Sequence, residues 1–177
     1  MHITIPKAIE RLARDHINVR RALNALEQQV ETVAQYQNPD KEIIAGVIAF
    51  LADNGAHHTV EDMIFNALRK RAPHKLEELD EVAAEHDEGR NRLEAFAEAA
   101  RLAQRDIDTN RLAFCRAARA FIDFERKHIH KEEMRFFRYA IEFLTAHDWM
   151  KIEWGINDAD SNASEEAGPS RMVLKTF

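Results

Sequence analysis

Four long stretches of this 177-residue chain carry apolar residues at alternating spacings of three and four, and this periodicity restricts the fold more than any other feature. Such spacing places the apolar side chains on one face of an α-helix. The stretches run from about Pro6 to Tyr36, from Asp40 to Pro73, from Lys75 to about Ile107, and from Asp108 or Thr109 to Phe143. The sequence therefore predicts four long helices joined by short turns, an all-α, up-down-up-down four-helix bundle.

Glycine and proline, the residues that most often interrupt helices, are few in this chain. The chain holds only five glycines and four prolines, which favours long helices over a sheet. Asp40 follows a break at Gln37–Pro39 and is of the type that caps a helix N-terminus. Pro73 is expected to end the second helix, because the residue before a proline disfavours helical backbone angles.

The domain organisation follows from where the periodicity stops. Residues 1–147 are predicted to form the bundle, and residues 148–177 a short, partly mobile C-terminal extension. Within the extension, residues 148–154 favour a short helix, and the polar stretch Gly155–Ser170 is typical of a mobile segment. The apolar run Met172–Leu174 is a candidate for docking on the bundle or on a neighbouring subunit.

Composition and charge exclude several classes of protein. A net charge of −6 argues against a nucleic-acid surface. No apolar stretch reaches the length of a membrane span, and the N-terminus lacks the pattern of a secretory signal. The single cysteine, Cys115, provides neither a disulfide framework nor a thiolate metal cluster. A cytoplasmic location is therefore expected.

Polar residues interrupt the apolar face of every predicted helix. They are His16 in the first, His57 and Glu61 in the second, His86 in the third, and His128 and Glu132 in the fourth. The second and fourth helices both contain His-x-x-x-Glu, which places imidazole and carboxylate on one face, one turn apart. Left unpaired in a core, each group would cost a few kcal/mol, about 2–7 for a neutral polar group. Two divalent cations would remove most of that cost, and the nitrogen and oxygen donors suit iron, and less selectively manganese, zinc or cobalt.

Two further histidines lie close to these pairs. His58 is rotated by about 100° from His57 around the helix, so it is an alternative ligand in place of His57. His130 points away from His128 and would exchange roles with it only if the helix register shifted. The helical stripes favour His57 and His128 as the ligands.

Together these segments resemble the hemerythrin-like, or HHE cation-binding, family over about residues 8–145. The resemblance is carried by Asp15-His16, His57-His58-x-x-Glu61-Asp62-x-x-Phe65, Glu85-His86 and His128-x-x-x-Glu132-Glu133-x-x-x-Phe137. It implies a four-helix bundle with His16, His57, Glu61, His86, His128 and Glu132 as metal ligands. It also implies two non-haem iron ions bridged by oxide and carboxylate, with zinc or manganese as alternatives.

One position departs from the oxygen-carrying members of that family, which have a second histidine one turn after the third-helix ligand. Here Arg90 stands at that position. A missing imidazole leaves open metal positions, which favours binding or redox processing of a small molecule such as dioxygen, nitric oxide or peroxide over reversible oxygen storage.

Other functions stay open from the sequence. With no nicotinamide or flavin fingerprint, electrons would come from a separate electron-donor protein, and a homodimer is possible. The alternative hypothesis is a non-enzymatic iron- or oxygen-responsive sensor or interaction module whose fold depends on metal. A zinc- or haem-binding bundle is a third, although two core carboxylates argue against haem.

Overall fold

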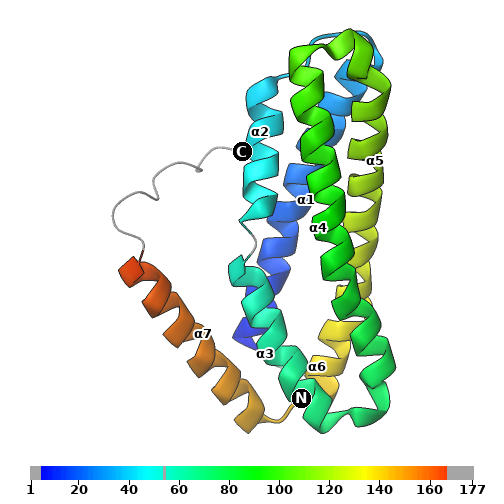
Figure 1. Cartoon of the computed structure of the whole chain (residues 1–177). Helices are drawn as coiled ribbons and strands as arrows, with labels where there is room; N and C mark the ends of the chain where they lie inside the picture. Colours follow the sequence, from blue (N-terminus) through cyan, green and yellow to red (C-terminus); the bar gives the residue numbers. More distant parts are fainter. Residues whose placement is uncertain (1–4, 54, 167–177) are drawn as a thin grey trace.

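The structure is a computed structural model that describes residues 5–53 and 55–166, with side chains as far as residue 161 (Figure 1). Its helices are α1 (Lys7–Ala34), α2 (Lys41–Ala52), α3 (Gly55–Arg71), α4 (Leu76–Arg105), α5 (Ile107–Lys131), α6 (Phe137–Phe143) and α7 (Ala146–Glu166), with a 3₁₀ turn at Pro73–Lys75 and a π-helical turn, η2, at Glu132–Phe136. The described residues contain no strand. The predicted all-α bundle is confirmed, with α2 and α3 sharing one of its four positions and α5, η2 and α6 another.

The second helix is not continuous, so the prediction of one helix from Asp40 to Pro73 is wrong in this respect. Asp53 leaves the helical conformation at the end of α2, and α3 begins at Gly55; Asn54, between them, lies outside the described residues. Aspartate and glycine both have low helix propensities, which accounts for a break here. The N-cap prediction is confirmed, since the Asp40 carboxylate accepts hydrogen bonds from two backbone N–H groups of the first turn, at 2.9 and 3.1 Å.

The fourth bundle position begins earlier than predicted and contains a change of helical pitch. Asp106, not Asp108 or Thr109, caps α5, and its carboxylate accepts a hydrogen bond from the Thr109 N–H at 3.1 Å. At η2 the backbone hydrogen bonds join residues five apart in place of four, so the helix is wider there. Such π-helical turns occur frequently at functional sites, and this one starts at the candidate ligand Glu132.

The C-terminal helix is longer than the sequence suggests. It runs from Ala146 to Glu166, so the short helix predicted at 148–154 is wrong in its length, and the helix extends into the segment that begins at Gly155. Helix α7 lies against α1 and α3 on the outside of the bundle (Figure 1), where it buries Ile152 and Ile156. Met172–Leu174 lies outside the described residues.

The bundle has two apolar cores, separated by a polar layer. One core lies among α2 and the facing halves of α1, α4 and α5; the other lies among α3, α6 and the remaining halves of α1 and α4. Phe96 and Phe121 stack in the first core, and Phe65 and Phe136 stack in the second. The polar layer between them holds the histidines and glutamates that interrupt the apolar faces. Among the described helices, none is both long enough and apolar enough to cross a membrane.

Candidate metal centre

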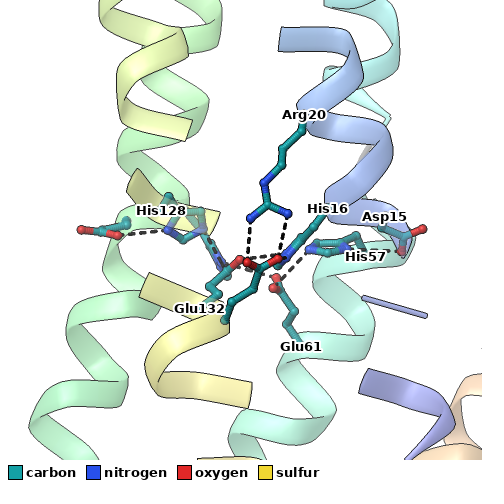
Figure 2. Close-up of polar contacts among 10 residues, drawn as sticks. Asp15, His16, Arg20, His57, Glu61, His128 and Glu132 are labelled. Carbon is teal, nitrogen blue, oxygen red and sulfur yellow. Dashed lines mark hydrogen bonds and ion pairs between the residues drawn. The ribbon is translucent and has the colours of Figure 1, made fainter. Parts of the chain in front are cut away.

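All six predicted ligand residues meet in the polar layer between the two cores. They are His16 from α1, His57 and Glu61 from α3, His86 from α4, His128 from α5 and Glu132 from η2. Both glutamates and His16 are almost fully buried, with relative exposures of 0–1%. Figure 2 shows Glu61 and Glu132 in the middle of the layer, with His16 and His57 on one side and His128 on the other.

The donor atoms of the six predicted ligands form two adjacent groups, which we name position 1 and position 2. Position 1 consists of His16, His57, Glu61 and Glu132, and position 2 of His86, His128 and Glu132; within each group one donor atom per residue lies within 4.8 Å of all the others. In position 1, His57 Nε2 lies 3.2 Å from Glu61 and His16 Nε2 lies 3.1 Å from Glu132. In position 2, Glu132 Oε1 lies 3.0 Å from His128 Nε2 and 3.3 Å from His86 Nε2.

Both carboxylates reach across the two positions. Glu61 approaches His57 with Oε1 and His86 with Oε2, the latter at 3.4 Å. Glu132 approaches His16 with one oxygen and His86 and His128 with the other. A carboxylate with one oxygen in each group has the arrangement that bridging two cations requires.

The donor set fits a metal better than it fits a hydrogen-bonded core. His16 Nε2 and both carboxylate oxygens of Glu61 are buried without a hydrogen-bond partner among the described residues. The Glu61 oxygens lie 3.2 and 3.4 Å from imidazole nitrogens, and His16 Nε2 lies 3.1 Å from a carboxylate oxygen of Glu132. Buried polar atoms without partners are costly and rare in native proteins. The nitrogen and oxygen lone pairs of these unpartnered atoms converge on one layer, which is what a divalent cation would satisfy.

A second set of carboxylates orients three of the imidazoles. Asp15 lies 3.3 Å from Nδ1 of His57, Glu133 lies 3.1 Å from Nδ1 of His16, and Glu85 lies 3.0 Å from Nδ1 of His128. An Nδ1–H that donates to a carboxylate leaves the Nε2 lone pair free for a metal and raises its basicity. In each case Nε2 faces the centre of the layer (Figure 2).

Sequence reasoning found this supporting set only in part. Asp15, Glu85 and Glu133 all stand in the segments that resemble the family, but the sequence does not show which imidazole each supports. Each of the three directly precedes or follows a ligand on its own helix and supports a ligand on another. A carboxylate next to a ligand residue therefore indicates a supporting role. Its position in the sequence does not indicate which helix carries the imidazole that it supports.

Basic residues hold two of these carboxylates in place. Arg20 donates two hydrogen bonds to Glu133, at 2.9 and 2.6 Å (Figure 2). Lys131 contacts Glu85 and donates to Glu81 at 3.0 Å. These contacts lower the pKa of Glu133 and of Glu85 although burial acts in the opposite direction. Both carboxylates consequently stay ionised, as acceptors for an Nδ1–H must be.

Without a metal, the layer carries a concentrated and unevenly distributed charge. Burial disfavours the charged form of His57, but contacts with Asp15 and Glu61 outweigh it and raise its pKa to about 10. For His128, burial is likewise outweighed, by Glu132 and Glu85, and its pKa rises to about 9. Both imidazoles therefore carry a proton at neutral pH in the metal-free protein, and a metal must displace it.

The two central carboxylates are shifted in opposite directions. Burial and the charge of Glu132 raise the pKa of Glu61. Burial also acts against the charge of Glu132, but contacts with His128, His16 and His86 hold its pKa well below the ordinary value. Two neighbouring buried carboxylates such as Glu61 and Glu132 resist simultaneous ionisation because their charges repel. Two bound cations would remove that repulsion.

The neighbouring residues do not all lie where the sequence suggested. His130 is exposed, as predicted. The Arg90 side chain is 66% exposed and pairs with Asp87 at 3.2 Å, so it supplies no metal donor. His58 is half-buried in the layer, with its ring centroid 4.7 Å from that of His86. Burial and the neighbouring imidazoles lower the pKa of His58 to about 4, which keeps it neutral near pH 7.

A cavity of about 470 Å³ borders the layer on the side of α2, α4 and α5. Its walls include Ile48, Leu51, Leu93 and Phe121, and the histidines and glutamates of both positions face it. Gly89 also lines the cavity, and it lets α5 side chains approach α4 closely, since a Cβ there would lie 3.0 Å from the carboxylate of Glu125 and 3.2 Å from the ring of Phe124. The layer therefore borders a cavity whose walls combine apolar side chains with charged ones such as Glu94 and Glu125.

Comparison with known proteins bears on this site. The family model of the hemerythrin HHE cation binding domain matches residues 7–140, which include all six predicted ligands. Searches among curated proteins and among solved structures gave no match.

Proposed function

Because the chain belongs to the hemerythrin HHE cation-binding family, we propose that its polar layer holds two iron ions in a non-haem di-iron centre. His16 and His57 would bind at position 1, His86 and His128 at position 2, and Glu61 and Glu132 would bridge the two. The observation that carries the proposal is the set of buried donor atoms, on Glu61 and His16, that converge on one layer without hydrogen-bond partners. Nitrogen and carboxylate donors suit iron, whereas zinc and manganese are the metals to test against it.

We further propose that the centre binds or redox-processes a small molecule such as dioxygen, nitric oxide or peroxide. The cavity beside the layer supports this, because it places a space of about 470 Å³ directly against the donor residues. Bound iron would supply Lewis-acid and one-electron chemistry at the layer. An electron-donor protein would provide the reducing equivalents.

The protein's own residues would contribute orientation and exclusion of water. Asp15, Glu85 and Glu133 hold the Nδ1 protons of three imidazoles, so that the Nε2 atoms face inward. Phe65 and Phe136 close the layer on one side, and Phe121 lines the cavity on the other. A low-polarity surrounding strengthens every electrostatic contact made inside it.

Metal analysis with optical spectroscopy tests the proposal. We expect two irons per chain in protein purified aerobically from iron-replete cells, with the charge-transfer band of a bridged ferric pair. Glu61→Ala and Glu132→Ala should each lower occupancy at both positions, while Glu88→Ala, at a surface carboxylate that pairs with Arg92, should not. No iron and no such band would overturn the di-iron proposal.

Adding nitric oxide anaerobically to the reduced protein tests the small-molecule part. We expect a new absorption band that saturates as the gas is titrated. If nitric oxide, dioxygen and hydrogen peroxide all leave the spectrum unchanged, the centre does not handle these molecules. Loss of helical structure on chelation, without consumption of any oxidant, would then favour the metal-dependent interaction module.

A further inference from the structure

Resting on the proposed di-iron function, we infer that His58 is a seventh metal ligand that provides a third imidazole at position 2. The helical stripe of α3 selects His57 and leaves His58 about 100° away around the helix axis. That rotation places His58 outside the face of α3 that packs on α1. Since α3 borders more than one helix, His58 can still face another neighbour.

The face that carries His58 meets α4 at its candidate ligand. The rings of His58 and His86 lie 4.7 Å apart between centroids and are inclined at 32°. One donor atom each of His58, Glu61 and His86 lies within 4.8 Å of the others. The preceding residue faces the other way, since the rings of His57 and His16 lie 5.1 Å apart. Two successive imidazoles thus serve the two positions, with Glu61 between them.

The surroundings of His58 also favour a ligand over a residue that only fills space. The side chain is half-buried, and neither of its ring nitrogens has a hydrogen-bond partner among the described residues. Three other imidazoles of the layer each contact a carboxylate through Nδ1. A half-buried imidazole without such a partner has a nitrogen lone pair available, and a cation held by the donor group of His58, Glu61 and His86 would accept it.

With His58 included, the two positions become unequal. Position 1 keeps two imidazoles, His16 and His57. At position 2, His86 belongs to two overlapping donor groups, one with His58 and Glu61 and one with His128 and Glu132, so His58 would be the third imidazole there. The expectation drawn from Arg90, that a missing imidazole leaves both metals open, then does not apply to position 2. The imidazole would come from α3 in place of α4, where Arg90 turns outward.

The test compares His58→Ala with His130→Ala, which removes an exposed imidazole. In chelator competition, His58→Ala should weaken one of two metal equivalents by more than about 100-fold, above the 10–100-fold typical of residues that only support a ligand. Millimolar imidazole should restore part of the affinity, because it can enter the space that the substitution leaves. His130→Ala should bind both equivalents as the wild type does.

Two further measurements keep the outcomes separate. If His58→Ala fails to fold, His58→Gln, which keeps a polar side chain of similar length, replaces it, with circular dichroism of the metal-free form as the check. Two equivalents bound to His58→Ala with wild-type affinity would overturn the inference and leave the di-iron proposal intact. Absence of metal from the wild-type protein would overturn the di-iron proposal itself.

Discussion

The carboxylates that support the imidazoles should differ in importance according to their burial and contact distance. Glu85 is the most enclosed, with 20% of its side chain exposed, and lies 3.0 Å from His128. Asp15 is the most open, with 38% exposed, and lies 3.3 Å from His57. Solvent weakens the more exposed contact, so neutralising Glu85 should cost more metal affinity than neutralising Asp15.

The size of the effect follows from the range known for groups that support metal-bound histidines, about 10–100-fold in affinity. Glu85→Gln belongs near the upper end, about 100-fold or about 2.8 kcal/mol, and Asp15→Asn near the lower end, about 10-fold or about 1.4 kcal/mol. The two losses should also fall on different metals, because His128 belongs to position 2 and His57 to position 1.

Chelator competition with ferrous iron under anaerobic conditions measures both equivalents in one titration. Glu88→Gln is the matched control, since it also lies on α4 and pairs with Arg92 at the surface, away from the layer. Equal losses in Glu85→Gln and Asp15→Asn, a reversed order, or losses no larger than that of Glu88→Gln would refute the reasoning from burial and distance.

Three other perturbations test the pH dependence of stability and metal binding, the packing of the core and the capping of a helix. The pKa values of about 10 for His57 and about 9 for His128 are raised, so protonation of these imidazoles stabilises the metal-free protein fully below pH 6.5, and this contribution is lost as pH rises through 9–10. Because a metal must displace those protons, the apparent metal affinity should rise as pH is raised from about 6 towards 10. Metal binding that does not depend on pH between about 6 and 10 would contradict this. The Phe65 ring is fully buried and stacks on Phe136 with centroids 4.1 Å apart. Phe65→Ala should therefore lower the free energy of unfolding by about 3–5 kcal/mol in denaturant titration. A loss below about 1 kcal/mol would count against tight packing beside the layer. Asp40→Ala should cost about 1 kcal/mol in the same assay through loss of the α2 cap, with Asp40→Asn close to the wild type.

Much of the candidate site was predictable because helical periodicity and burial reinforce each other. A polar residue on an apolar stripe must lie in the core, and this places His16, His57, His86 and His128 in one interior from the sequence alone. The spacing of four residues put Glu61 and Glu132 on the same faces. The π-helical turn that starts at Glu132 was not predictable, since nothing in the local sequence distinguishes it from α-helix.

By itself, the sequence determined the helices, their inward faces and the residue types that must share the interior, because these depend on spacing within single segments. Only the tertiary structure decided which neighbour each side chain meets. It joined Asp15 to His57 and Glu85 to His128, and it turned Arg90 outward. It also brought His58 against His86, since a residue outside one helix–helix interface can lie inside the next. Contacts between helices depend on packing across the whole bundle, which no single stripe encodes.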